Sequence, residues 1–588
     1  MRRSFVLGIT VILFVVAVAQ AQPGCDRTIK ADVVAIDQPY FINRLGAAMA
    51  EGMVFALRRD VVPSTGTMLA PGNAVLRKGK RARPIVLRAN VGDCLQIKFT
   101  NLLAPAPVPN TSQPVTRAAS VHAAGMEVVG TINDDGSFVG ANPNALASAV
   151  APGNTKTYVI RATKEGTFLL NTMGAMMGGE NLTDDGAQQT AGLFGAINVQ
   201  PKGSFWYRSQ VTEGELIAAT TGNTALNQPK INFEAKDGSG VPVLRMLDDS
   251  NEIIYTDLTA IITGPPANKY MFVDDGQPSF SKNYAEPDRL QPYREFTIAY
   301  HELSDAVQAF PVFGNSNQNK FGGLTSRTLQ AGGDAFAINY GTGGIGAEIL
   351  ANRLGVGPEA TCPDCGFEEF FLSSWTVGDP AQVVDIPANV PCSSGTNQPA
   401  VTAGKSSLDN KNLAPVPCTV SVVGNAPAGV TPFRKATKAL YPDDPSNVYH
   451  SYLNDRVKFR ILHAGTGVSH VHHQHAHQWI HSPNNNESTY LDSQLISPGS
   501  AYTLEIDYNG GGNRNKTVGD SIFHCHFYPH FAAGMWALWR THDTYELGTH
   551  LDANGVPTAG ARALPDPEIP QGTPIPALVP MPALAMPP

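Results

Sequence analysis

Three kinds of sequence feature are scarce in this chain of 588 residues. It has no run of basic residues of the kind that binds nucleic acid, and its formal net charge is only −8, so we set nucleic-acid partners aside. Beyond the N-terminal segment, no stretch is apolar for long enough to cross a bilayer. Long helical periodicity is also rare. Glycine (56) and proline (45) are abundant instead, which favours many short strands joined by turns.

The N-terminal segment has the composition of a secretory signal. Two arginines precede an apolar run, and Ala19-Gln20-Ala21 fits the small-x-small cleavage pattern. We predict a signal peptide at residues 1–21, cleavage before Gln22 and export to the periplasm or the extracellular space, with no membrane span in the mature protein. An uncleaved membrane anchor is the alternative, although the apolar run is short for spanning.

Cysteine is scarce as well, with seven residues in the chain. In an exported protein six of them can form disulfides, although the sequence leaves their connectivity open. The plausible pairs are Cys25–Cys94 and Cys392–Cys418. The "CPDC" at 362–365 fits a redox or zinc half-site, but the chain lacks a second CxxC, so a structural disulfide is favoured. The seventh, Cys525, lies between two histidines.

Strand-like segments recur along most of the chain. Segments that read as strands recur within 83–201, 252–344 and 454–512, and the residues after 550 are rich in proline. We therefore expect an all-β chain of tandem Greek-key β-sandwich domains. The expected division is 1–21 signal, 22–203 first domain, 204–385 second domain, 386–550 third domain and 551–588 tail or linker. A two-domain chain with large insertions is the alternative.

Histidine is concentrated near the C-terminal end, where 12 of the 15 lie between His463 and His550. If "SIFHCHF" (521–527) is a strand, His524 and His526 face one way and Cys525 faces the other. One segment can then serve two metal sites. One cysteine, two histidines and a weakly bound methionine make a blue-copper electron-transfer site. His530 and Met535 follow the strand and can supply two of these ligands.

A second histidine-rich segment, "HVHHQHAH" (470–477), can supply the missing ligands. We expect His473, His475 and His477 to share one face, and His470 to point another way. His470 would then join Cys525, while His473 and His475 would join the neighbouring site. Zinc or a loose metal-binding loop is the alternative. Zinc usually closes one tetrahedron of ligands, whereas the histidines that flank Cys525 cannot reach its metal.

The two segments resemble the signatures of the multicopper oxidase family. "HCHFYPHFAAGM" (524–535) matches H-C-H-x3-H-x3-G-M, and 470–477 matches H-P-x-H-x-H-G-H with Val471 for the proline and Ala476 for the glycine. In the first region, "SVHAAGM" (120–126) falls where the family has S-I-H-x-H-G, and "GTFLLNTM" (166–173) where it has G-T-x-W-Y-H-S-H. The resemblance covers residues 83–201 and 454–540 well, and the middle poorly.

The resemblance implies cupredoxin-like domains, copper cofactors and a set of ligands. The type 1 copper would bind Cys525, His470, His530 and Met535; the type 2 copper would bind His122 and His473; type 3 ligands would be His475, His524 and His526. In the family, a reducing substrate gives single electrons to type 1 copper. They pass through the Cys525 bridge to His524 and His526 and reach a three-copper cluster that reduces dioxygen. Phenols and cuprous, ferrous or manganous ions are all open as reductants, and the residues indicate no oligomeric state.

The first region departs from the family at three of its four ligand positions. Ala124, Asn171 and Met173 stand where histidines are expected, and only His122 remains. An alanine cannot bind copper, and an amide or a thioether is a poor substitute for imidazole on cupric copper. Met173 has further methionines at 176 and 177, which could hold Cu(I) or fill a core. We therefore expect a modified copper cluster.

Two functions follow from this pattern. The first is a copper-dependent oxidoreductase that passes electrons from type 1 copper to the modified cluster, and from there to an acceptor such as dioxygen. The alternative is a non-catalytic exported blue-copper protein for electron transfer or copper binding. A subunit whose missing ligands come from another chain is a weaker possibility, because two-domain relatives of that kind keep their own histidines.

Overall fold

The computed structural model describes most of the first 264 residues and most of the residues after 447. The described ranges are 24–41, 47–49, 52–107, 113–137, 148–175, 187–225, 227–264, 292–303, 306–308, 335–341, 382–383, 438–439, 448–482, 487–508, 510–532, 534–553, 557–563, 574–582 and 584. The predicted signal peptide, the CPDC segment and the Cys392–Cys418 pair lie outside them. Across these ranges, no helix has both the length and the apolar character needed to span a bilayer.

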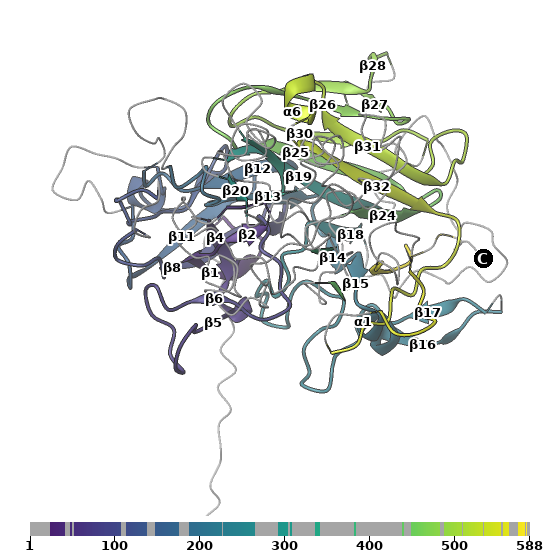
Figure 1. The fold of residues 1–588 in the computed structure, drawn as a ribbon, viewed down its shortest axis with the longest axis horizontal. Coiled ribbons are helices and arrows are strands. Elements are labelled where there is room, and N and C mark those ends of the chain that lie inside the picture. Colours follow the sequence, from purple (N-terminus) through teal and green to yellow (C-terminus); the bar gives the residue numbers. More distant parts are fainter. Residues whose placement is uncertain are drawn as a thin grey trace, which may run out of the picture.

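Two mixed sheets form an N-terminal sandwich (Figure 1). The first has the order β10 (Glu127–Val128), β11 (Thr155–Arg161), β8 (Cys94–Asn101), β1 (Thr28–Asp37) and β4 (Met53–Leu57). The second has the order β7 (Ile85–Asn90), β13 (Phe194–Gln200), β12 (Gly166–Asn171) and β9 (His122–Ala123). In β1 the buried Ile29 and Ala31 alternate with half-buried Lys30 and Asp32, as expected for a strand with one face on a core.

A second sandwich carries both histidine-rich segments. One sheet has the order β14 (Phe205–Arg208), β18 (Thr259–Thr263), β19 (Tyr293–Leu303), β25 (Val457–His463) and β30 (Ala501–Glu505), with β21 (Ala335–Ile338) paired to β19. The other has the order β24 (Tyr449–Tyr452), β32 (Trp536–His542), β31 (Gly519–Cys525), β26 (His470–Gln474) and β29 (Ser493–Ile496). The prediction of an all-β chain of tandem sandwiches is therefore confirmed.

The first sheet of this second sandwich crosses the boundary that we predicted at residue 385. Strands β14, β18 and β19 precede the boundary, β25 follows it, and β19 pairs with β25 in parallel. Among the described residues, the segments 204–385 and 386–550 thus share one sheet. Two domains with large insertions would account for this pairing, and the division into three domains stays a prediction.

Short elements connect and cover the sandwiches. The remaining strands are β2 (Tyr40–Phe41), β3 (Ala47–Met49), β5 (Val61–Val62), β6 (Val75–Leu76), β15 (Gln210–Val211), β16 (Thr220–Asn223), β17 (Pro229–Ile231), β20 (Ala306–Gln308), β22 (Gln382–Val383), β23 (Lys438–Ala439), β27 (Trp479–Ile480), β28 (Tyr490–Leu491) and β33 (Ala577–Leu578). In the part of the chain that the structure describes, the helices are α1 (Glu213–Ala219), α6 (Tyr528–Ala532) and the 3₁₀ turns Arg58–Asp60 and Ile132–Asp134.

Part of the proline-rich segment is packed against the second sandwich. Strand β33 pairs with β15, and Ile575, Leu578 and Val579 are buried. The carbonyl of Leu578 accepts a hydrogen bond from the Tyr452 hydroxyl at 3.0 Å. Our expectation of a tail or linker did not include this packing, because a proline-rich composition does not predict a short strand.

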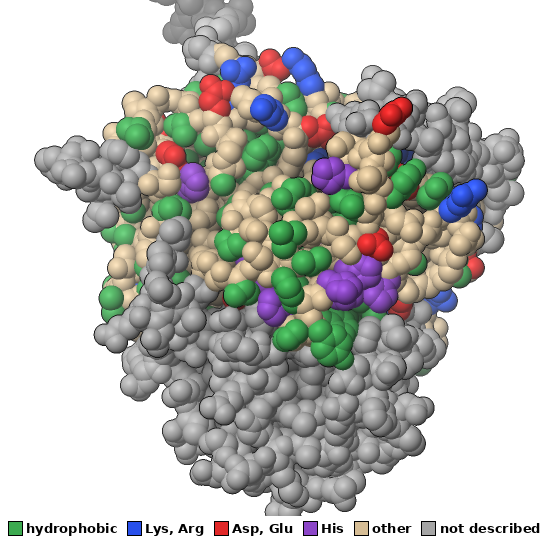
Figure 2. All heavy atoms as spheres, turned by 90° about the horizontal axis from the view of Figure 1, so that it is seen from above, with side chains coloured by type: hydrophobic (Ala, Val, Ile, Leu, Met, Phe, Trp, Pro, Cys, Tyr) green, Lys and Arg blue, Asp and Glu red, His purple; other side chains and the backbone are tan. Residues whose placement is uncertain are grey.

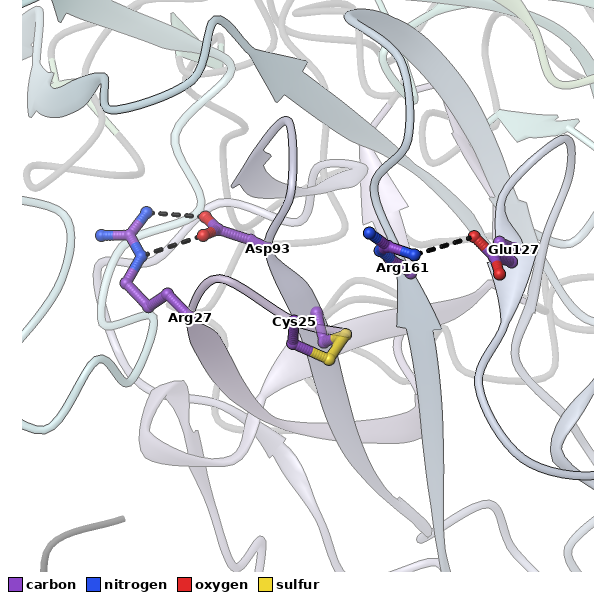
Figure 3. The surroundings of a disulfide bond; sticks show 6 residues. Cys25, Arg27, Asp93, Glu127 and Arg161 are labelled. Atoms are coloured by element: carbon purple, nitrogen blue, oxygen red, sulfur yellow. Dashed lines mark hydrogen bonds and ion pairs between the residues drawn. A yellow bond between two sulfur atoms is a disulfide. The ribbon is translucent and has the colours of Figure 1, made fainter. Parts of the chain in front are cut away.

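A disulfide closes one end of the N-terminal sandwich. Cys25 and Cys94 are bonded, as the sequence predicted, and are separated by 69 positions in the sequence. Figure 3 shows this bond beside the ion pair of Arg27 and Asp93, whose Nη2 and Oδ2 atoms are 2.7 Å apart. The bond fixes the segment that precedes β1 to the start of β8.

A buried ionic network joins the two sandwiches. Glu295 of β19 accepts hydrogen bonds from Arg88 of β7 (2.9 Å), Asn198 of β13 (2.9 Å) and Arg460 of β25 (3.1 Å). Glu295, Arg88 and Arg460 are all almost completely buried. The carboxylate therefore links strands of the first sandwich to the sheet that supports the histidine-rich strands of the second.

Candidate metal centres

Two antiparallel strands place the predicted ligands on opposite faces of one sheet. In the pairing of β26 with β31, His472 lies opposite Cys525, and His473 lies opposite His524. Cys525 is buried, whereas His524 is only half-buried. Because side chains alternate along a strand, the thiol points into the sandwich and His524 points outward. The two residues therefore belong to two separate groups of metal-binding atoms.

The first group consists of Cys525, His470 and His530. The Sγ atom of Cys525 lies 3.8 Å from Nδ1 of His470 and 3.4 Å from Nδ1 of His530. The two Nδ1 atoms are 3.0 Å apart. Ligands at about 2.0 Å (N) and about 2.3 Å (S), spread evenly around one ion in a plane, would be about 3.5–3.8 Å apart. The three atoms are therefore close to the spacing needed to share one metal ion.

The loop after Cys525 brings His530 and Met535 back toward the thiol. His530 lies on α6, and the amide of Cys525 donates to the Met535 carbonyl at 3.0 Å. Met535 is completely buried in the same core as Cys525. The backbone thus holds Met535 beside the group, and its role as a weak ligand stays a prediction.

Burial sets the protonation of the first group. It raises the pKa of the Cys525 thiol to about 11 and lowers the pKa of His470 to about 3. Burial, with a smaller effect of His470, also lowers the pKa of His530 to about 4. Both imidazoles are therefore neutral at pH 7, which is the form that binds a metal, whereas metal binding would displace the proton of the thiol.

The second group consists of His473, His475 and His524. Their ligand atoms lie within 4.8 Å of one another, and the Nε2 atoms of His475 and His524 are 3.0 Å apart. Nδ1 of His524 lies 2.8 Å from the Cys525 carbonyl, and Nδ1 of His473 lies 2.9 Å from the Asp492 carbonyl. A carbonyl can only accept, so these Nδ1 atoms carry the protons and each Nε2 keeps its lone pair.

This second group lies at the protein surface. Figure 2 shows histidine side chains gathered in one place on the surface. His473, His475 and His524 are half-buried, and His526 is exposed. The ring of His526 is 5.0 Å from that of His473, but its nitrogens lie outside the group of three. The group therefore offers three imidazoles and a side that is open to small molecules.

The first-region positions do not join either group. His122 of β9 lies opposite Asn171 of β12, and its Nδ1 is 2.7 Å from Oδ1 of Asp135. The buried Asn171 donates to the side chain of Gln189 at 2.9 Å. Ala124 packs against the hydrophobic core. Among the described residues, His122 thus belongs to neither group, although the resemblance implied that it would share a type 2 copper with His473. Residues 176 and 177 lie outside the described ranges.

Three other histidines have structural surroundings. The Nδ1 atom of His472 is 2.7 Å from the Tyr300 hydroxyl, and the ring of His463 stacks on that of His470 with centroids 4.5 Å apart. The expectation that His477 shares a face with His473 is wrong. Strand β26 ends at Gln474 and the chain turns at Ala476 (φ 60°), so His477 is buried against Trp539 instead.

One residue that sequence reasoning missed is Glu302 on β19. Its Oε1 atom is 3.2 Å from Nε2 of His470, and both side chains are buried. Burial raises the pKa of Glu302, while His463 and the amides of Thr466 and Val468 oppose that rise. The available signal was a glutamate within the otherwise strand-like segment "REFTIAYHEL" (294–303).

Comparisons with known proteins find similar folds only. No protein-family model matches the chain, and no curated protein matches it. A solved structure titled multicopper oxidase is 13% identical, with 89% of this chain and 92% of that chain covered and a TM-score of 0.34. A copper nitrite reductase from Nitrosomonas europaea is 11% identical, with 90% and 99% covered and a TM-score of 0.36. A blue copper oxidase from Nitrosomonas europaea is 12% identical, with 88% and 86% covered and a TM-score of 0.34. At this level of identity and TM-score, function must be inferred from the residues themselves.

Proposed function

We propose that the protein is a copper-dependent oxidoreductase of the multicopper oxidase type. It would take electrons from a reducing substrate at the Cys525 group and pass them to a modified copper centre at the histidine group. The observation that carries the proposal is that consecutive residues, Cys525 and His524, belong to two separate groups of metal-binding atoms. A single backbone segment thus connects the two groups covalently.

The donor set of the first group suits copper better than zinc. One sulfur and two imidazole nitrogens converge at a largely buried position, and Met535 is the adjacent soft side chain. A trigonal set of this kind with a weak thioether ligand is the blue-copper arrangement, whereas zinc favours four strong ligands. Bound copper would supply one-electron chemistry at both groups. The burial of Cys525 and His470 excludes water and holds the ligands in place.

The second group would receive the electrons and present them to an acceptor. His524 is tied to Cys525 by the peptide bond and by the hydrogen bond from its Nδ1 to the Cys525 carbonyl. His473 and His475 complete three imidazoles with an open side, which is the arrangement of catalytic rather than structural metal sites. Dioxygen is the candidate acceptor. Because His122 is held by Asp135 and three family ligands are replaced, the centre would differ from a three-copper cluster.

We further propose that the protein acts after export, with a small molecule or a metal ion as the reductant. The Cys25–Cys94 disulfide supports an oxidising compartment. A non-catalytic electron-transfer role is the second candidate, and the replacements at Ala124, Asn171 and Met173 favour it. The two candidates differ in whether the second group delivers electrons to dioxygen.

Copper analysis combined with reoxidation kinetics tests the proposal. We expect about two copper ions per chain, one for each group of ligand atoms, and a blue absorption that is bleached by a reductant and restored by dioxygen. The His475→Ala variant should keep the blue absorption but lose its restoration by dioxygen. The exposed His481, outside both groups, gives the matched control His481→Ala, which should behave as the wild type.

Three outcomes would contradict the proposal. A colourless copper-loaded wild type would exclude the first site. A blue protein that dioxygen does not reoxidise would leave the non-catalytic candidate. Normal reoxidation of the His475→Ala variant would show that the second group is not the route to the acceptor.

A further inference from the structure

We propose that Glu302 is a positioning residue for the Cys525 group. Its carboxylate would fix the tautomer and orientation of His470 and thereby lower the reduction potential of copper bound there. This inference rests on the proposed function of the first group, and Glu302 lies about 170 positions before His470 in the sequence.

The two nitrogens of His470 face two different partners. Nδ1 lies 3.8 Å from Sγ of Cys525 and 3.0 Å from Nδ1 of His530. Nε2 lies on the other side of the ring, 3.2 Å from Oε1 of Glu302. This spacing is that of an ion pair, and the contact does not have the geometry of a hydrogen bond. The negative carboxylate favours a proton on the Nε2 that faces it, which leaves the lone pair of Nδ1 for the metal.

The carboxylate of Glu302 is itself held in place. Its Oε2 accepts from the amide of Thr466 at 3.1 Å, and its Oε1 accepts from the amide of Val468 at 3.2 Å. Both amides belong to the loop between β25 and β26. Gly465 of the same loop leaves room for the carboxylate, because a Cβ atom at this position would overlap Glu302 Oε2. The loop therefore surrounds the carboxylate and presents it to His470.

His463 completes this arrangement without acting as a metal ligand. Glu302, His463 and His470 bring ligand atoms within 4.8 Å of one another, so a metal site among them must be considered. However, Nε2 of His463 lies 2.6 Å from the Val468 carbonyl, and its Nδ1 accepts from the amide of Gly465 at 3.1 Å. Both nitrogens are thus occupied, and the ring stacks on His470 at an interplanar angle of 13°.

The consequence concerns the balance between the two oxidation states of copper. A carboxylate beside the outer nitrogen of a ligating histidine makes that histidine a stronger donor, and a stronger donor favours Cu(II) over Cu(I). Outer partners of this kind change metal affinity by about 10–100-fold. Loss of the Glu302 charge should therefore raise the reduction potential.

A redox titration of the blue absorption in the copper-loaded protein tests the inference. We expect Glu302→Gln to change the ratio of Cu(II) to Cu(I) affinity by about tenfold or more, and each factor of ten raises the potential by about 59 mV. The matched control is Glu546→Gln. Glu546 is equally buried and lies 3.1 Å from Nδ1 of His542, but it belongs to no group of metal-binding atoms. Its potential should equal that of the wild type.

A second variant separates the positioning role from loss of folding. Gly465→Ala keeps the carboxylate but displaces it from the loop, so it should also raise the potential and alter the spin-resonance hyperfine splitting. An unchanged potential in either folded variant would overturn the inference, as would an equal shift in Glu546→Gln. A wild type without blue absorption would overturn the proposed function, whereas a blue wild type with unshifted variants would overturn this inference alone.

Discussion

The stability of the whole molecule should depend on the carboxylate that joins the two sandwiches. Burial by itself would raise the pKa of Glu295, but Arg88 and Arg460 outweigh burial and lower it to about 2 from the ordinary value of 4.5. Each pKa unit corresponds to about 1.4 kcal/mol. The ionised carboxylate therefore contributes about 3 kcal/mol to the free energy of unfolding at neutral pH.

We expect Glu295→Gln to lower the free energy of unfolding at pH 7 by about 3–5 kcal/mol. The lower figure follows from the pKa shift, and the upper figure is the usual cost of leaving buried charges without their partner. Because the folded-state pKa of Glu295 is depressed, its contribution is complete above pH 4.5 and is lost as the pH falls from 4.5 toward 2. The difference between wild type and variant should shrink over the same interval.

Denaturant unfolding of the copper-free protein at several pH values measures this difference. The matched control is Asp32→Asn, which removes the partly exposed pair of Asp32 with Lys98 (3.1 Å) and should change stability by less than about 1 kcal/mol. A loss below about 1 kcal/mol in Glu295→Gln, or a difference from wild type that does not change between pH 7 and pH 3, would refute the reasoning.

Two further predictions concern the cysteines. Cys525→Ser should abolish the blue absorption of the copper-loaded protein, because serine lacks the sulfur that lies 3.4 Å from Nδ1 of His530; a visible spectrum that stays blue would refute the ligand assignment. Joint replacement of Cys25 and Cys94 by serine should lower the free energy of unfolding by about 4 kcal/mol, because the bond closes a loop of about 69 residues in the unfolded chain. Unfolding curves that coincide with those of the wild type would contradict this estimate.

Local patterns in the sequence were sufficient to predict much of the two sites. Alternation along a strand separates Cys525 from His524, and the structure places them in different groups. The three-residue interval between His470 and His473 likewise predicts different directions for their rings. These predictions depend only on the geometry of one strand, which is why they could be made without knowledge of the partners of that strand.

Features that depend on non-local pairing or on the end of a strand could not be predicted. Glu302 reaches His470 because β19 pairs with β25 across a long stretch of intervening sequence. The position of His477 depends on the end of β26 at Gln474. The alternation of histidines continues past Gln474, so the sequence does not indicate that the strand ends there. His122 matches the family motif, but the motif does not predict that Asp135 lies beside the ring of His122.

The pairing of β33 with β15 has a consequence for the order of assembly. Arg294 of β19 donates to the Val579 carbonyl at 3.1 Å, so residues near 579 complete hydrogen bonds in the sheet that begins at β14. During synthesis the N-terminal sandwich can close early, because its strands all lie before residue 201. The hydrogen bonds of the second sandwich cannot be completed until the residues near 579 have been synthesised. Metal loading of a finished fold would then follow synthesis of nearly the entire polypeptide.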